Sequence, residues 1–112
     1  MFTIYHNPRC SKSRQTLALL EEHGVNITVV EYLKNPLSKD EIEGLSAKLK
    51  VSIIEMMRTK ETEFSEQNLK NADEETLINA MVNTPKLMER PIVVHDNKAV
   101  IGRPPENVLN II

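Results

Sequence analysis

Residues 2–17 read FTIYHNPRCSKSRQTL and decide the fold, because an apolar segment passes directly into a helical one there. Phe2–His6 predicts a strand, and Ser11–His23 predicts a helix that ends at Gly24. Val25–Tyr32 is rich in β-branched residues and predicts a second strand. A strand–helix–strand unit implies two parallel strands joined by a right-handed crossover.

Cys10, the only cysteine, lies at the junction of that first strand and helix. A thiol there meets the unpaired N–H groups of a first helical turn and the positive end of the helix dipole. Arg9, Lys12 and Arg14 add positive charge nearby. Such surroundings favour the thiolate and can lower a cysteine pKa from about 8.5 to about 3.5–7.5. A lone cysteine is most often a small buried hydrophobic residue, but Ser11 and these cations favour a reactive thiol.

The remaining chain predicts helices in its middle and strands near its end. The expected helices begin at the capping box Ser38–Glu41, near Ile53 and at Asn71, whereas residues 59–70 are polar and ambiguous. A strand hairpin at 91–101, turning at 96–98, and a short terminal helix from Pro105 follow. The predicted fold class is α/β, with a small mixed four-stranded sheet flanked by helices. A helical insertion of about 36–88 follows the second strand, within a single domain 1–112.

Net charge and composition limit which classes of partner and which location are expected for the protein. The chain has 112 residues, a net charge of −2, and charges of both signs interspersed, which argues against nucleic acid or a membrane surface as partner. The chain has no apolar run of about 18 residues, so no membrane helix is expected. Its N-terminal segment has neither a basic n-region nor an apolar h-region, so no signal peptide is expected. A single cysteine cannot form an internal disulfide. A cytoplasmic location is therefore expected.

Several kinds of chemistry are disfavoured. His6, His23 and His95 are far apart and no metal-ligand spacing occurs, so no metal is expected. A cysteine-dependent phosphatase loop would return to an arginine six positions after the cysteine, whereas Arg14 comes only four positions after it. Position 13 holds serine where a dithiol protein would hold a resolving thiol. Any adduct on Cys10 must therefore be released by a thiol from outside.

Three arginines lie at the edges of predicted elements: Arg58, Arg90 and Arg103. Arginine offers a planar fork that binds an oxyanion through two hydrogen bonds, which lysine cannot do. The alternative for each arginine alone is a solvated surface charge.

Four motifs, in order along essentially the whole chain, carry a family resemblance: residues 5–14, Arg58, Glu89-Arg90-Pro91-Ile92 and residues 101–106. Together they resemble the glutaredoxin-dependent arsenate reductases. The resemblance implies a thioredoxin-like fold with an inserted helical region, in agreement with the element order above.

Carried over to this chain, the resemblance implies that Cys10 is the nucleophile and that His6 helps to hold its thiolate. Arg58, Arg90 and Arg103 would bind the oxyanion, and Pro91 would follow a cis peptide bond. Supporting roles would fall to Asn7, Ser13 and Arg14. The implied reaction reduces arsenate to arsenite through a Cys10 adduct resolved by glutathione and glutaredoxin. It requires no cofactor beyond glutathione as co-substrate, and a monomer is expected.

Two other functions stay open. The family usually has Gly-Thr after the cysteine, where this chain has Ser11-Lys12, so a glutathione-dependent thiol oxidoreductase with another oxyanion or a mixed disulfide as substrate is one alternative. The second is a non-enzymatic regulator that binds a protein partner. Superfamily regulators sense redox state through Cys-x-x-Cys, and Ser13 disfavours that switch.

Overall fold

A computed structural model describes residues 1–112, and the chain forms two compact units within it. One unit joins Met1–Asn35 to Arg90–Ile112, and the other is Pro36–Glu89. The sequence predicted an insertion over about 36–88. That the whole chain is a single domain stays a prediction. None of the helices has the length and apolar character needed to cross a bilayer.

The first unit contains a mixed four-stranded sheet. Its elements, in chain order, are β1 (Phe2–Tyr5), α1 (Ser11–Glu22), β2 (Ile27–Val30), β3 (Ile92–His95), β4 (Lys98–Ile101) and the 3-10 helix η3 (Pro105–Asn110). The strand order is β2-β1-β3-β4. β1 pairs with β2 in parallel and with β3 antiparallel, and β3 pairs antiparallel with β4. The predicted fold class is thus confirmed.

The lengths of the first two strands follow from their pairing. The parallel register runs from Phe2 opposite Ile27 to Tyr5 opposite Val30. β2 is therefore shorter than the predicted strand 25–32, because β1 supplies only four residues to pair with it. Strand propensity marked the right segment but could not find its ends.

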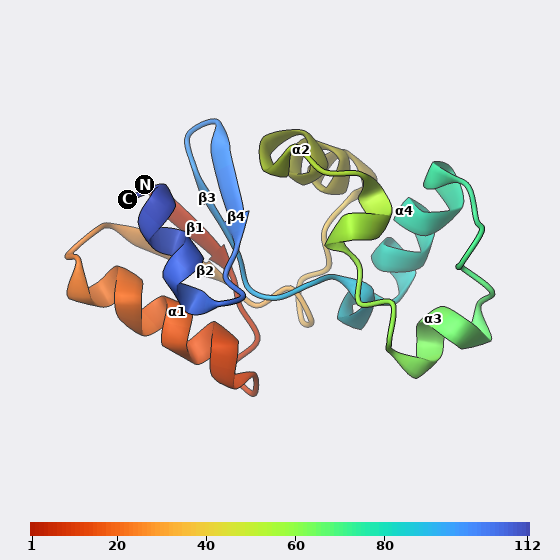
Figure 1. The fold of residues 1–112 in the computed structure, drawn as a ribbon, viewed down its shortest axis with the longest axis horizontal. Coiled ribbons are helices and arrows are strands. Elements are labelled where there is room, and N and C mark those ends of the chain that lie inside the picture. Colours follow the sequence, from red (N-terminus) through yellow and green to blue (C-terminus); the bar gives the residue numbers. More distant parts are fainter. The chain divides into compact units, whose positions relative to one another are not determined.

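A hydrophobic core lies between one face of the sheet and two helices, α1 and η3 (Figure 1). Its buried residues are Phe2, Ile4, Leu20, Val93, Val108 and Ile111. Phe2 and Ile4 alternate with less buried residues along β1, as expected for a strand with one covered face. This packing fixes α1 against β1, and so fixes the junction that carries Cys10.

The second unit is helical. Its elements are α2 (Lys39–Leu49), the 3-10 helix η1 (Ile53–Met56), α3 (Thr62–Glu66), α4 (Glu74–Asn83) and the 3-10 helix η2 (Pro85–Leu87). The predicted capping box is confirmed, because Ser38 Oγ accepts from Glu41 N–H at 3.2 Å and Glu41 Oε1 accepts from Ser38 N–H at 2.9 Å. Asp73 caps α4 by accepting from Thr76 N–H at 2.9 Å.

Within this unit, an isolated antiparallel bridge joins the segment after η1 to the segment after η2. Met57 pairs with Met88, and the Arg58 N–H donates to the Leu87 carbonyl at 2.6 Å. The Glu89 N–H donates to the Met56 carbonyl at 2.8 Å. These backbone bonds hold Arg58 and Glu89 on neighbouring segments although 31 positions separate them in the sequence.

Candidate active site

The loop from Asn7 to Cys10 is shaped by Asn7. Its carbonyl accepts from the Cys10 N–H at 3.0 Å, and its side-chain Oδ1 accepts from the Arg9 N–H at 3.0 Å. Cys10 is the N-cap residue of α1, with φ −94° and ψ 123°. Its carbonyl accepts from the Arg14 N–H at 3.0 Å, the first hydrogen bond of the helix. The predicted helix-start position of the thiol is therefore confirmed.

The pKa of the Cys10 thiol is lowered from its ordinary value. Partial burial raises the pKa, but the backbone N–H of Ser13 and the Arg90 side chain favour the thiolate more strongly, with a further contribution from the Lys12 backbone. Arg90 acts both as a hydrogen-bond donor and as a charge. A lowered pKa agrees in direction with the sequence prediction and makes Cys10 a better nucleophile at neutral pH.

The cation that matters most differs from the sequence expectation. Arg9, Lys12 and Arg14 were expected to supply the positive charge, whereas Arg90 gives the largest charge effect on the thiol. The Arg14 guanidinium instead donates from Nη1 to the Pro8 carbonyl at 3.0 Å. Arg14 thus supports the loop, and Arg90 reaches the thiol only because β3 lies beside β1.

His6 and Ser13 form a buried pair of side chains that links the loop after β1 to the first turn of α1. His6 Nδ1 and Ser13 Oγ are 2.6 Å apart, and Ser13 Oγ also accepts from the Asn7 N–H at 3.0 Å. Both side chains are buried. Ser13 therefore ties the end of β1 to the first turn of α1, and its own backbone N–H favours the Cys10 thiolate.

His6 contacts Ser13, and no contact of His6 with the Cys10 thiol is seen. Burial lowers the pKa of His6, with the opposing effect of Glu31 and a further lowering by Arg14. A neutral imidazole is thereby favoured at neutral pH. Its contact in the structure is with Ser13 Oγ, so any support of the thiolate by His6 runs through Ser13.

Pro91 follows a cis peptide bond, as predicted, and the Arg103–Pro104 bond is also cis. The Pro91 carbonyl accepts from the Gly102 N–H at 2.9 Å. Gly102 lies so close to its neighbours that a Cβ would meet Thr16 Oγ1 at 2.6 Å and the Pro91 ring at 2.8 Å. The cis-proline segment is thus packed against α1 through a residue without a side chain.

Sequence reasoning missed Thr16 and Gly102. Thr16 is fully buried on α1, where its hydroxyl donates to the Lys12 carbonyl at 2.8 Å and lies 3.4 Å from the Gly102 carbonyl. Two signals pointed to them. Thr16 lies four residues before the core residue Leu20 on the same helix face, and Gly102 directly follows a strand, where a glycine often marks a close backbone approach.

The three predicted oxyanion arginines have different surroundings. Arg90 favours the Cys10 thiolate, and its Nε is buried without a hydrogen-bond partner. Arg103 is exposed and forms no ion pair. Arg58 belongs to the helical unit, where Glu61 and Glu89 contact its guanidinium. The convergence of all three arginines on Cys10 stays a prediction.

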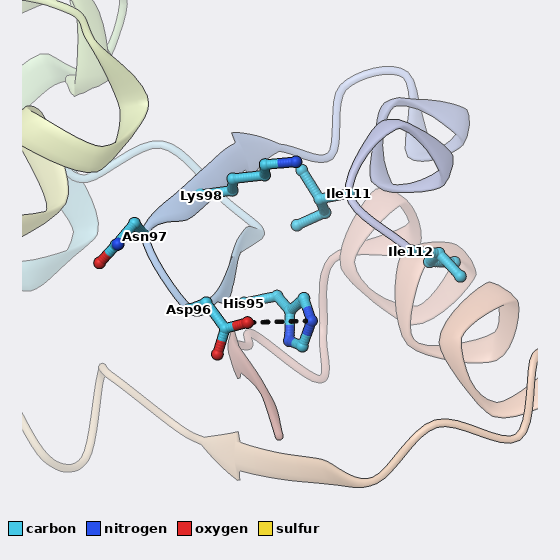
Figure 2. A pocket seen from close by; sticks show the side chains of 6 residues that line it. All are labelled: His95, Asp96, Asn97, Lys98, Ile111 and Ile112. Carbon is cyan, nitrogen blue, oxygen red and sulfur yellow. Dashed lines mark ion pairs between the residues drawn. The ribbon is translucent and has the colours of Figure 1, made fainter.

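A separate hollow lies at the tip of the β3–β4 hairpin (Figure 2). It has a volume of about 360 Å³ and is lined by residues 95–98 together with Ile111 and Ile112. His95 pairs with Phe2 at the start of β1, whereas Cys10 follows the end of β1. The hollow is therefore at the opposite end of the sheet from the thiol. No group of three or more His, Cys, Asp or Glu side chains could hold a metal ion.

Fold and site together define a thioredoxin-like protein with one thiol of lowered pKa at the start of α1 and a cis-proline before β3. Residues 5–111 match the sequence model of the ArsC family, and the chain belongs to that family.

Individual relatives agree with this assignment. The Escherichia coli K12 protein YfgD is 55% identical over 97% of this chain and 94% of its own length. A Haemophilus influenzae protein named arsenate reductase is 46% identical over 97% of each chain. The solved structure of a Vibrio cholerae arsenate reductase matches with a TM-score of 0.96 and 46% identity, covering 99% of this chain and 97% of that one.

Proposed function

We propose that this protein reduces arsenate to arsenite through a covalent adduct on Cys10. The observation that carries the proposal is the thiolate-favouring environment of Cys10, built from the Ser13 backbone N–H and the Arg90 side chain. Membership of the ArsC family supports it, as do the names of the relatives from Haemophilus influenzae and Vibrio cholerae.

The first step is an attack of the Cys10 thiolate on As(V). A sulfur–arsenic bond forms, one arsenate oxygen leaves as water, and arsenic keeps its oxidation state. Arg90 is well placed for this step because it already lies beside the sulfur that attacks. A guanidinium next to the incoming oxyanion also offsets part of the hydration that the anion loses.

The electrons come from outside the chain, since Cys10 has no second cysteine to pair with. Glutathione adds to the arsenic of the adduct through its sulfur and displaces a second oxygen as water. The glutaredoxin thiolate then attacks the glutathione sulfur, and the electron pair of the sulfur–arsenic bond stays on arsenic, which becomes As(III). Hydrolysis releases arsenite and restores Cys10. Two thiols are oxidised to one disulfide, and no bound metal or cofactor is needed.

A second candidate is the reduction of glutathione mixed disulfides. The pairing of Arg58 with Glu61 and Glu89 favours it, because two carboxylates at one guanidinium oppose the approach of a doubly charged anion. Here the Cys10 thiolate would attack a disulfide sulfur and release the other thiol, and external glutathione would then free Cys10. This reaction uses the same thiolate and needs no oxyanion site.

The deciding experiment measures arsenate-dependent oxidation of NADPH, with glutathione, glutaredoxin and glutathione reductase supplied. Turnover by the natural chain and its loss in Cys10→Ser is the expected result. The same two proteins are assayed with a glutathione mixed disulfide as substrate. Turnover of the disulfide without turnover of arsenate would reject arsenate reduction in favour of the second candidate. Turnover of neither would reject both.

A further inference from the structure

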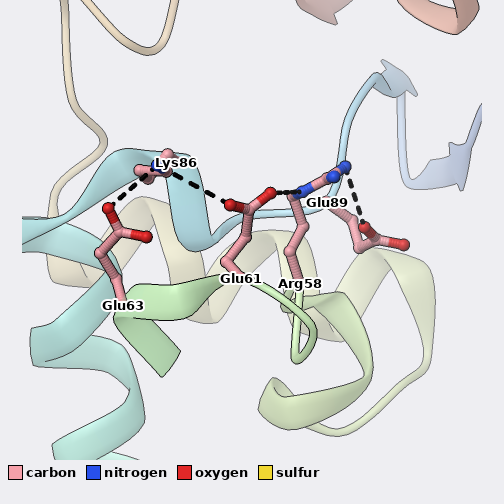
Figure 3. A network of polar contacts seen from close by, with 5 residues as sticks. All are labelled: Arg58, Glu61, Glu63, Lys86 and Glu89. Atoms are coloured by element: carbon pink, nitrogen blue, oxygen red, sulfur yellow. Dashed lines mark hydrogen bonds and ion pairs between the residues drawn. The ribbon is translucent and has the colours of Figure 1, made fainter. Parts of the chain in front are cut away.

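Arg58 is held by two carboxylates in the helical unit (Figure 3). Its Nε donates to Glu61 Oε1 at 2.9 Å, and its Nη1 lies 3.7 Å from Glu89 Oε1. The Arg58 side chain is only 20% exposed. The two contacts are made by Nε and Nη1, and Nη2 makes neither of them. The guanidinium is therefore held at two of its three nitrogens, and the Nη2 hydrogens remain for another acceptor.

The contact with Glu61 is part of a longer network. Glu61 Oε2 lies 3.7 Å from Lys86 Nζ, and the same ammonium lies 2.9 Å from Glu63 Oε2. The hydrogen bond from Lys86 lowers the pKa of Glu63. Glu61 is thus held from both sides, by Arg58 through Oε1 and by Lys86 through Oε2.

The contact with Glu89 is supported by the backbone. The bridge between Met57 and Met88 and its flanking hydrogen bonds place Arg58 and Glu89 on paired segments. Glu89 is also the residue immediately before Arg90. The carboxylate that touches one predicted oxyanion-binding arginine is therefore covalently next to another.

We propose that Glu61 and Glu89 are positioning residues for Arg58, which hold its guanidinium so that Nη2 and the remaining Nη1 hydrogen can donate to the oxyanion. This inference rests on the proposed function, since it gives Arg58 a ligand. A free arginine side chain loses much conformational freedom when it binds. A guanidinium already fixed by carboxylates loses less, so its hydrogen bonds strengthen anion binding more.

The same carboxylates could act in the opposite way. Three of them, Glu61, Glu63 and Glu89, surround two cations, Arg58 and Lys86. If they only competed with the oxyanion for the guanidinium, removing one negative charge would tighten anion binding. If they position Arg58, the same removal weakens it. The sign of the change therefore separates the two roles.

The variants Glu61→Gln and Glu89→Gln each remove one negative charge with little change in side-chain shape, so they test whether anion binding weakens or tightens. In each, KM for arsenate should rise by about three- to thirtyfold, a range typical of coupling within one ion-pair network. The alkylation rate of Cys10 by iodoacetamide should stay unchanged. Glu63→Gln is the matched control, because Glu63 touches Lys86 but not Arg58, and its KM should match that of the natural chain. A KM that stays constant or falls in both test variants would overturn the proposal.

Two further measurements exclude a merely structural effect. In an Arg58→Lys background, Glu61→Gln should raise KM no further, since lysine has no Nε–H for Glu61 to hold. A further rise of the same size would show that Glu61 acts without Arg58. The Arg58 Nε–H proton in nitrogen-15 NMR spectra should exchange slowly with solvent in the natural chain and faster in Glu61→Gln.

The NMR measurement also separates this proposal from the proposed function. If the natural chain reduces no arsenate, the function is rejected, and the exchange rate still reports whether Glu61 holds the guanidinium. If arsenate is reduced but the Arg58 Nε–H exchanges equally fast in both proteins, the positioning role is rejected and arsenate reduction stands.

Discussion

Gly102 offers the sharpest test of how the site is packed. A Cβ at this position would lie 2.6 Å from Thr16 Oγ1, 2.8 Å from the Pro91 ring and 3.1 Å from Thr16 Cγ2. The first distance is about 0.8 Å shorter than an ordinary contact of 3.4 Å. Gly102→Ala therefore cannot be accommodated without movement of α1 or of the cis-proline segment.

Neither neighbour can easily move aside. Thr16 is fully buried, its hydroxyl donates to the Lys12 carbonyl at 2.8 Å, and both branches of its side chain face the new methyl group. The Pro91 ring is rigid, and the backbone carbonyl of Pro91 accepts a hydrogen bond from the Gly102 N–H. Overpacking of this kind costs about 1–3 kcal/mol. Alanine also lowers the conformational entropy of the unfolded chain, which offsets about 0.4–1 kcal/mol of this destabilisation.

We therefore expect Gly102→Ala to lower the free energy of unfolding by about 1–2 kcal/mol, measured by urea unfolding followed by circular dichroism. Cys10 alkylation should also slow, because the strained segment includes the residue after Arg90. The matched control is Gly44→Ala. Gly44 is exposed within α2, a Cβ there meets nothing within 4 Å, and alanine should stabilise the helix by about 0.5–1 kcal/mol. A Gly102→Ala protein as stable as the natural chain would refute the packing argument.

Three more outcomes are expected. Arg90→Met should raise the pKa of Cys10, because it removes a hydrogen bond and a charge that favour the thiolate, and the midpoint of iodoacetamide alkylation against pH should move upward. A midpoint unchanged from the natural chain would remove Arg90 from the thiol's surroundings. Ser13→Ala should cost about 1–3 kcal/mol in urea unfolding, since it leaves the buried His6 nitrogen and the Asn7 N–H without their partner. Ser38→Ala, an exposed helix cap, should cost only about 1 kcal/mol. Stability should fall as pH drops below about 6.5, because burial lowers the folded pKa of His6 and the unfolded chain takes up the proton first. An equal acid loss in His6→Asn would contradict this cause.

Local signals in the sequence predicted the local structure well. The strand–helix–strand start, the Ser38–Glu41 capping box and the final hairpin all depend on residues close together in the chain, and all three are confirmed. The segment 62–66 was ambiguous because α3 is a five-residue helix in polar sequence. Phe64 is its one buried residue, so it had too few apolar positions to show a helical period.

The sequence predicted candidate site residues but not the contacts that these residues make. Cys10 and Pro91 could be marked from motifs. That Arg90, and not Arg14, favours the thiolate depends on the pairing of β1 with β3, which joins residues some 90 positions apart. The ion pair between Arg58 and Glu61 is local, because the two residues are only three positions apart in the sequence. It was overlooked because ion pairs at that spacing are common on helix surfaces and usually weak.

The motif Glu89-Arg90-Pro91 gives each of three successive residues a different neighbour. Glu89 contacts the Arg58 guanidinium, Arg90 favours the Cys10 thiolate, and the Pro91 carbonyl accepts from Gly102. The three contacts are separate although the residues are consecutive. Glu89→Gln removes a charge without altering the Arg90 side chain, so it should change the hold on Arg58 and leave Cys10 alkylation as it is. Gly102→Ala strains the Pro91 segment instead, so it should slow Cys10 alkylation.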